Sequence, residues 1–81
     1  MQSGFLEIDV HGMTKAQAIA AIDARLRRAD GAVYRLRIIH GFHGGTRIKE
    51  AIEDEFSYGR VEKVKNVRPG TNYGITELIL R

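Results

Sequence analysis

The sequence contains no cysteine and no tryptophan, and it has one proline among its 81 residues. The absence of cysteine excludes a disulfide scaffold, a zinc–thiolate site and a cysteine nucleophile. It is compatible with a reducing compartment, and we expect a cytoplasmic protein. Aromatic residues make up 7% of the chain, which is too few for a broad surface on which nucleic-acid bases stack.

Long apolar segments are also missing. No run approaches the roughly 20 residues that a transmembrane helix needs, so we expect no membrane association. The first four residues, Met1–Gly4, have neither a basic region nor an apolar segment. We expect them to form a flexible N-terminus ahead of a single domain over residues 5–81. The formal net charge of +3 is a mild excess that suits a polyanion such as nucleic acid.

The first half of the chain reads as two strands joined by a helix. Apolar and polar residues alternate over Phe5–Val10 and again over Val33–Ile39, which predicts two strands. Apolar residues recur at helical spacing over Lys15–Ala29 between them, and Thr14 with Gln17 forms a capping-box pattern. A strand, a helix and a second strand predict a parallel, right-handed crossover.

The second half predicts a helix, a strand, a loop and a last strand. Their expected bounds are, in order, from Gly45 or Thr46 to Tyr58–Gly59, Arg60–Arg68 with an irregular start, Pro69–Asn72, and Tyr73–Leu80. We expect the last strand to run antiparallel to the one before it. The order β-α-β-α-β-β predicts an α/β chain, more specifically an α+β two-layer sandwich. Its four-stranded mixed sheet would carry both helices on one face and leave the other face of the first two strands open to water.

Two His-Gly pairs each follow a predicted strand and precede a helix. The carboxyl ends of parallel strands form the crevice where such folds bind ligands, and His11 and His40 both fall there. Asp9 and His11 are two residues apart and point the same way, so the carboxylate can orient the imidazole for general acid–base chemistry. Strand parity puts His40 on the helix-side face, so the two rings converge only if the turn after Ile39 redirects His40.

The second His-Gly pair opens a glycine-rich turn with basic residues in the following helix. Backbone N–H groups around Gly41, Gly44 and Gly45, with Arg47 and Lys49 nearby, predict a phosphate-binding site. A phosphate held there would place its ester bond near the imidazoles, which predicts phosphodiester cleavage by positioning and proton transfer. The turn matches neither a nucleotide P-loop nor the dinucleotide-binding fingerprint.

No cluster of acidic and histidine residues has the spacing of a preformed metal site. We name Asp9, His11 and His40 as catalytic candidates, and they could recruit one Mg²⁺ together with a substrate phosphate. Arg35 and Arg37 share the face of Asp9 and join the phosphate-binding candidates. The alternative for these arginines is simple ion pairing with Glu7 and Asp9 across adjacent strands. The basic residues of Arg60–Arg68, Lys63 among them, could form a stripe that binds nucleic acid. The alternative, which we favour, is that their charges keep an edge strand soluble.

Three segments resemble the signatures of the Smr (small MutS-related) domain. Ile8–Gly12 resembles its Leu-Asp-Leu-His-Gly motif, Ile38–Gly45 its His-Gly-x-Gly-x-Gly turn, and Gly74–Leu80 its closing Gly-x-Thr strand. The motifs fall in the family's order, and the resemblance runs from about Leu6 to Arg81. His43 stands where the family has its middle glycine. The pattern looks like the short stand-alone branch of the family.

The resemblance implies a fold like the C-terminal domain of bacterial translation initiation factor three. It also implies nucleic-acid binding and, as in several members, endonuclease activity on DNA or structured RNA. In family terms Asp9 and His11 would be the cleavage residues, His40, Gly41 and Gly45 would shape the turn, and Lys49 would be its basic residue. Implied settings are DNA repair or recombination and ribosome-associated RNA cleavage, with a ribosome or a MutS-like protein as partner. We expect a monomer. The alternative is a non-catalytic module that binds nucleic acid or another protein.

Overall fold

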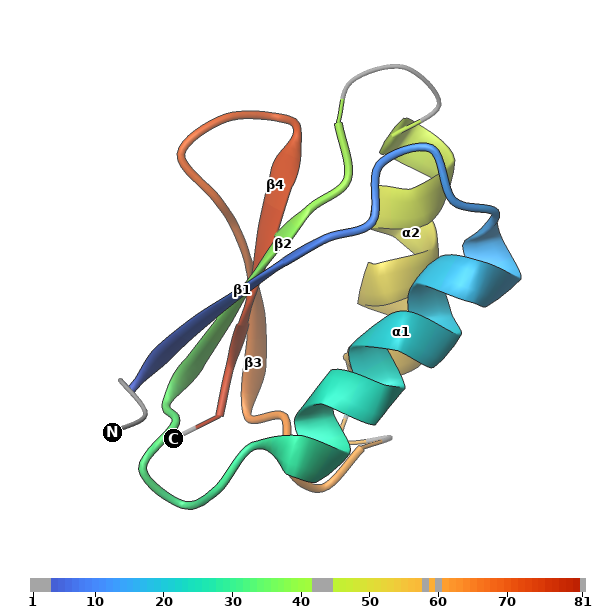
Figure 1. Cartoon of the computed structure of the whole chain (residues 1–81). Helices are drawn as coiled ribbons and strands as arrows, with labels where there is room; N and C mark the ends of the chain where they lie inside the picture. The colour runs from blue at the N-terminus through green and yellow to red at the C-terminus, as the bar shows by residue number, and fades with distance from the viewer. Residues whose placement is uncertain (1–3, 42–44, 58, 60, 81) are drawn as a thin grey trace.

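The computed structural model describes residues 4–41, 45–57, 59 and 61–80. Its elements in chain order are β1 (Phe5–Asp9), α1 (Lys15–Arg28), β2 (Arg35–Ile39), α2 (Gly45–Phe56), β3 (Asn66–Pro69) and β4 (Ile75–Ile79). The sheet order is β1-β2-β4-β3, with β1 parallel to β2 and β4 antiparallel to both of its neighbours. Both helices cover the same face of the sheet (Figure 1). The predicted mixed sheet and two-layer α+β fold are confirmed.

Helix α1 begins and ends where its side chains satisfy the terminal backbone groups. The backbone N–H of Gln17 donates to Thr14 Oγ1 at 3.1 Å, and the backbone N–H of Thr14 donates to Gln17 Oε1 at 3.0 Å. At the other end, Lys63 Nζ donates to the carbonyl oxygens of Leu26 and Ala29, at 2.6 and 2.9 Å. Lys63 therefore caps a helix, which is neither of the two roles considered for it from the sequence.

The core lies between the helices and one face of the sheet. The register aligns Leu6 with Leu36 and Leu36 with Leu78, so alternate residues of these three strands all point toward the helices. The largest buried apolar side chains come from every layer: Phe56, Ile22, Leu36, Ile38, Ile52, Leu78 and Val10. The opposite face of the same strands carries the predicted polar positions.

The third strand lies further along the chain than predicted. Residues 61–63 form a bend and a turn, and β3 begins at Asn66. Pro69 belongs to the strand, although the sequence predicted a loop from that residue. Proline is tolerated here because β3 is an edge strand. Gly70 then makes the hairpin possible, since a Cβ at that position would lie 2.3 Å from Ile75 Cγ2. The last strand consequently starts at Ile75, two residues later than predicted.

The chain joins the sheet one residue earlier than predicted. The Gly4 carbonyl oxygen accepts hydrogen bonds from the backbone N–H groups of Tyr34 and Arg35, at 2.8 and 3.3 Å. Gly4 is therefore tied to β2, while residues 1–3 of the predicted flexible N-terminus lie outside the described part of the chain. Within the described ranges, neither helix is long and apolar enough to cross a lipid bilayer.

Candidate functional site

The ends of β1 and β2 lie side by side and form a rim made of residues 10–12 and 39–41. The backbone N–H of Val10 donates to the Ile39 carbonyl oxygen at 2.8 Å, which extends the pairing past the end of both strands. Gly41 has a φ of +79°, a left-handed conformation that favours glycine. A Cβ on Gly41 would lie 3.4 Å from the Cβ of His11. The backbone of the second His-Gly pair therefore lies against the first.

Asp9 and His11 form a hydrogen-bonded pair at this rim. Asp9 Oδ1 accepts a hydrogen bond from the His11 ring at Nδ1, 2.6 Å away, and another from the His11 backbone N–H at 3.0 Å. These two bonds lower the pKa of the Asp9 carboxyl, which keeps it ionised. An ionised carboxylate can only accept, so Nδ1 carries the proton and Nε2 is left for a substrate. The His11 side chain is 70% exposed and the Asp9 side chain is 51% exposed, so a large ligand can reach them.

The His40 ring lies in the core and not at the rim. The residue is 1% exposed, and its Nε2 lies 2.8 Å from Thr76 Oγ1. Its Nδ1 lies 3.2 Å from the Gly41 carbonyl oxygen, so Nδ1–H donates there and Nε2 accepts from the Thr76 hydroxyl. Burial lowers the pKa of the imidazole, which favours this neutral form. The ring lies on the helix-side face, as strand parity predicted. The turn after Ile39 does not redirect it, so the condition for the two imidazoles to converge at the rim is not met.

The closing Gly-x-Thr segment holds the second His-Gly pair in place. The Gly74 carbonyl oxygen accepts the backbone N–H groups of His40 at 2.9 Å and of Gly41 at 3.1 Å. A Cβ on Gly74 would lie 3.4 Å from the Gly41 backbone, so the two glycines pack closely. Thr76 adds its hydroxyl to the His40 ring. His40 therefore positions the rim through the core, which is a different role from the catalytic one predicted for it.

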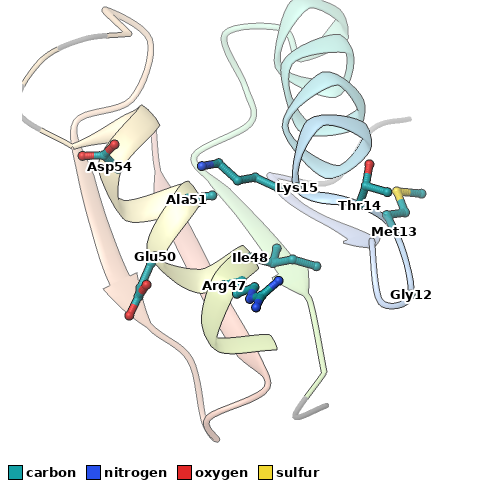
Figure 2. A pocket seen from close by; sticks show the side chains of 9 residues that line it. All are labelled: Gly12, Met13, Thr14, Lys15, Arg47, Ile48, Glu50, Ala51 and Asp54. Carbon is teal, nitrogen blue, oxygen red and sulfur yellow. The ribbon is translucent and has the colours of Figure 1, made fainter. Parts of the chain in front are cut away.

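A groove of about 930 Å³ opens beside the rim between the start of α1 and the stretch of α2 from Arg47 to Asp54 (Figure 2). It starts at Gly12, the residue after His11, and its charge is mixed, because Glu50 and Asp54 line it together with Lys15 and Arg47. Its lining residues are Gly12, Met13, Thr14, Lys15, Arg47, Ile48, Glu50, Ala51 and Asp54. The sequence singled out Arg47 and missed Lys15. The signal for Lys15 was a cation at the first helical position after a His-Gly pair.

Lys49 lies on a different side of α2. It lines a separate hollow of about 300 Å³ with the β3–β4 hairpin loop, residues 69–73, and Ile75. Arg47 and Lys49, predicted to share one phosphate, therefore contribute to two different surfaces. Gly45 begins α2, whereas Gly44 of the predicted phosphate-binding turn lies outside the described residues.

Arg35 and Arg37 hold a carboxylate on the open face of the sheet. Arg37 Nε lies 3.1 Å from Glu77 Oε2, and Arg35 Nη1 lies 3.3 Å from Glu77 Oε1. Glu77 is a central β4 residue whose side chain is 10% exposed. Arg37 also lies 3.7 Å from Glu7, as the alternative prediction of cross-strand pairing required, while Asp9 bonds His11 instead. Two arginines that neutralise a buried carboxylate are poorly placed to bind phosphate as well.

The site offers few ligands for a metal ion. Within residues 4–41, 45–57, 59 and 61–80, no group of three or more His, Cys, Asp or Glu side chains could hold one. Of the three side chains proposed to recruit Mg²⁺, His40 is buried and His11 Nδ1 is already bonded to Asp9. Asp9 remains as an exposed carboxylate, and Mg²⁺ typically binds one or two carboxylates together with waters and substrate phosphates. Recruitment of Mg²⁺ with the substrate therefore stays a prediction.

Comparison with known proteins identifies relatives of this arrangement. Residues 8–74 match the model of the Smr domain family. The crystal structure of the Smr domain of Thermus thermophilus MutS2 is similar to this structure, with a TM-score of 0.80 and 28% sequence identity. The match covers 93% of this chain and 96% of that one. No match was found among curated proteins.

Proposed function

Because the chain belongs to the Smr domain family, we propose that it binds nucleic acid at the rim and nicks it through Asp9 and His11. The observation that carries this proposal is the exposed Asp9–His11 pair, whose ring and carboxylate lie 2.6 Å apart. The groove that begins at Gly12 supports it, since Lys15 and Arg47 line it and can contact phosphates of the nucleic-acid backbone.

The proposed cleavage uses His11 Nε2 as the proton acceptor. A water molecule or a ribose 2′-hydroxyl gives its proton to Nε2 while its oxygen attacks the phosphorus. The bond between phosphorus and the leaving oxygen breaks, and the protonated imidazole or solvent supplies the proton that this oxygen takes up. Asp9 orients the ring and stabilises the imidazolium through a short, charge-assisted hydrogen bond. Backbone at Gly41 leaves room for the phosphate, because it presents no side chain to His11.

The proposed substrates are DNA and structured RNA. The settings in which such a nick would act are DNA repair or recombination, and RNA cleavage on the ribosome in the cytoplasm. The partner would accordingly be a MutS-like protein or the ribosome. We route no step through Mg²⁺, and the cleavage assay decides whether Mg²⁺ brought with the substrate contributes.

The test is a cleavage assay on supercoiled plasmid and on structured RNA, with Mg²⁺ and with a chelator. Wild type should nick at least one substrate, and His11→Ala and Asp9→Asn should each lower the rate at least about 100-fold, the usual range for losing general acid–base catalysis. Asp23→Asn is the matched control, because this carboxylate pairs with Arg27 on the surface of α1. An inactive wild type, or a fully active His11→Ala variant, would refute the catalytic proposal.

A second candidate function is nucleic-acid binding without cleavage. The burial of His40 favours it, since this leaves a single imidazole from the two His-Gly pairs at the rim. Affinity should then fall steeply with salt, and Lys15→Ala and Arg47→Ala should each reduce the salt slope by about 1. His11→Ala should leave the affinity unchanged. A chain without affinity for any nucleic acid would instead be a protein-interaction module.

A further inference from the structure

Tyr73 is the most exposed large apolar side chain among the described residues. It is 83% exposed, compared with 45% for Tyr34 and 37% for Met13. It stands in the hairpin loop between β3 and β4, which lies at the same end of the sheet as the β1–α1 connection (Figure 1). Exposed aromatic rings are a means by which proteins hold nucleic-acid bases.

The loop that carries Tyr73 is linked through backbone contacts to the Asp9–His11 pair. Its neighbour Gly74 bonds the backbone of His40 and Gly41 through one carbonyl oxygen. On its other side, Gly41 lies against His11. A single backbone segment, that of Gly41, therefore separates the hairpin loop that carries Tyr73 from the imidazole.

The backbone around Tyr73 is fixed by its own hydrogen bonds. Asn72 Oδ1 accepts the Gly74 N–H at 2.8 Å, and the Asn72 carbonyl oxygen accepts the Ile75 N–H at 3.2 Å. The Gly70 N–H donates to the Ile75 carbonyl oxygen at 2.9 Å and closes the hairpin below the loop. A ring on such a loop loses little conformational freedom when a ligand stacks on it.

A cation lines the same hollow as Tyr73. Tyr73 and Lys49 line the same hollow of about 300 Å³, together with Asn72 and Ile75. A lysine and an exposed aromatic residue that line one hollow match the two parts of a nucleotide, its phosphate and its base. The low aromatic content excludes a broad stacking surface, but one ring suffices for one base.

We propose that Tyr73 stacks on an unpaired base of the bound nucleic acid while Lys49 contacts its phosphate. The chain would then select substrates that carry an unpaired nucleotide next to the rim, because paired bases are covered by their neighbours in the duplex. This inference rests on the proposed nucleic-acid binding and not on cleavage.

The test measures binding to a single-stranded oligonucleotide containing 2-aminopurine, and to a blunt duplex of the same length. Tyr73→Ala should weaken binding to the single strand about 5- to 150-fold and reduce the quenching of 2-aminopurine, while duplex binding changes less than twofold. Tyr73→Phe should keep both properties. Tyr34→Ala is the matched control, since Tyr34 is also exposed but precedes β2, at the opposite end of that strand from the rim.

Each outcome decides the inference. Single-strand affinity that survives in Tyr73→Ala would overturn it and leave the proposed function standing. An equal loss on single strand and duplex would also overturn it, because the change would then act through the fold or through phosphate contacts. A wild-type chain that binds neither probe would overturn the inference and the proposed nucleic-acid binding together.

Discussion

Replacing Thr76 by valine tests how much the hydrogen bond between the Thr76 hydroxyl and the buried His40 ring contributes to the stability of the fold. Valine has nearly the shape of threonine, so Thr76→Val removes the hydrogen bond to His40 Nε2 at 2.8 Å and leaves the packing in place. Both residues are 1% exposed, so water cannot replace the lost donor. The change therefore isolates one buried interaction that joins β2 to β4.

The expected loss in the free energy of unfolding follows from the imidazole nitrogen that Thr76→Val leaves without a donor. A buried polar atom without a partner costs about 1–3 kcal/mol, more than the net contribution of a typical hydrogen bond. At about 4–8 °C per kcal/mol for a domain of this size, the Tm should fall by about 4–24 °C. Replacing both partners by apolar residues, as in His40→Leu with Thr76→Val, should recover part of this loss, because the imidazole nitrogen left without a partner is then removed as well.

Urea denaturation followed by circular dichroism measures the free energy of unfolding of each variant. Thr71→Val is the matched control, because Thr71 is exposed in the hairpin loop and should stay within about 0.5 kcal/mol of wild type. A Thr76→Val variant as stable as this control would refute the reasoning. The His40 ring would then hold its position through packing alone.

Two further predictions concern the same region. Because burial lowers the pKa of His40, the unfolded chain binds a proton below about pH 6.5 while the folded chain does not. His40 should therefore make wild type lose up to about 1.4 kcal/mol of stability per pH unit below pH 6.5. The difference in free energy of unfolding between wild type and His40→Gln should shrink as the pH falls from about 7.5 to about 5. A difference that stays constant over this range would contradict the prediction. Gly41→Ala should cost about 1–2 kcal/mol, because a Cβ is strained at φ +79°. It should also weaken nucleic-acid binding by crowding His11. Unchanged affinity in a binding assay would show that the ligand does not approach over Gly41.

Local patterns in the sequence were enough to predict the first half of the fold. The capping box of Thr14 and Gln17, the alternation in β1 and the helical spacing in α1 each depend on residues close together in the chain. The same holds for the Asp9–His11 pair, because two residues at i and i+2 on a strand must share a face. These features were predictable because no distant segment is needed to form them.

Features that depend on distant pairing were not predictable. The position of β4 between β2 and β3 decides which carboxylate Arg35 and Arg37 meet, and Glu77 was therefore missed. Val61, Val64 and Val67 recur every third residue, which fits neither a strand nor a helix, so the predicted start of β3 was wrong. The Gly-x-Thr motif was recognised, but the partner of Thr76 depends on the β2–β4 register, which pairs Ile38 with Thr76.

Register also explains why two similar His-Gly pairs serve different purposes. The parallel pairing aligns Asp9 with Ile39, so the next position on the same face aligns His11 with Gly41 and not with His40. His40 then falls on the opposite face, in the core, where its ring joins Thr76. The imidazole at the rim consequently has a bare backbone as its neighbour. The approach of a phosphate to His11 that we propose depends on this arrangement, in which the second pair contributes a glycine to the rim and keeps its histidine inside.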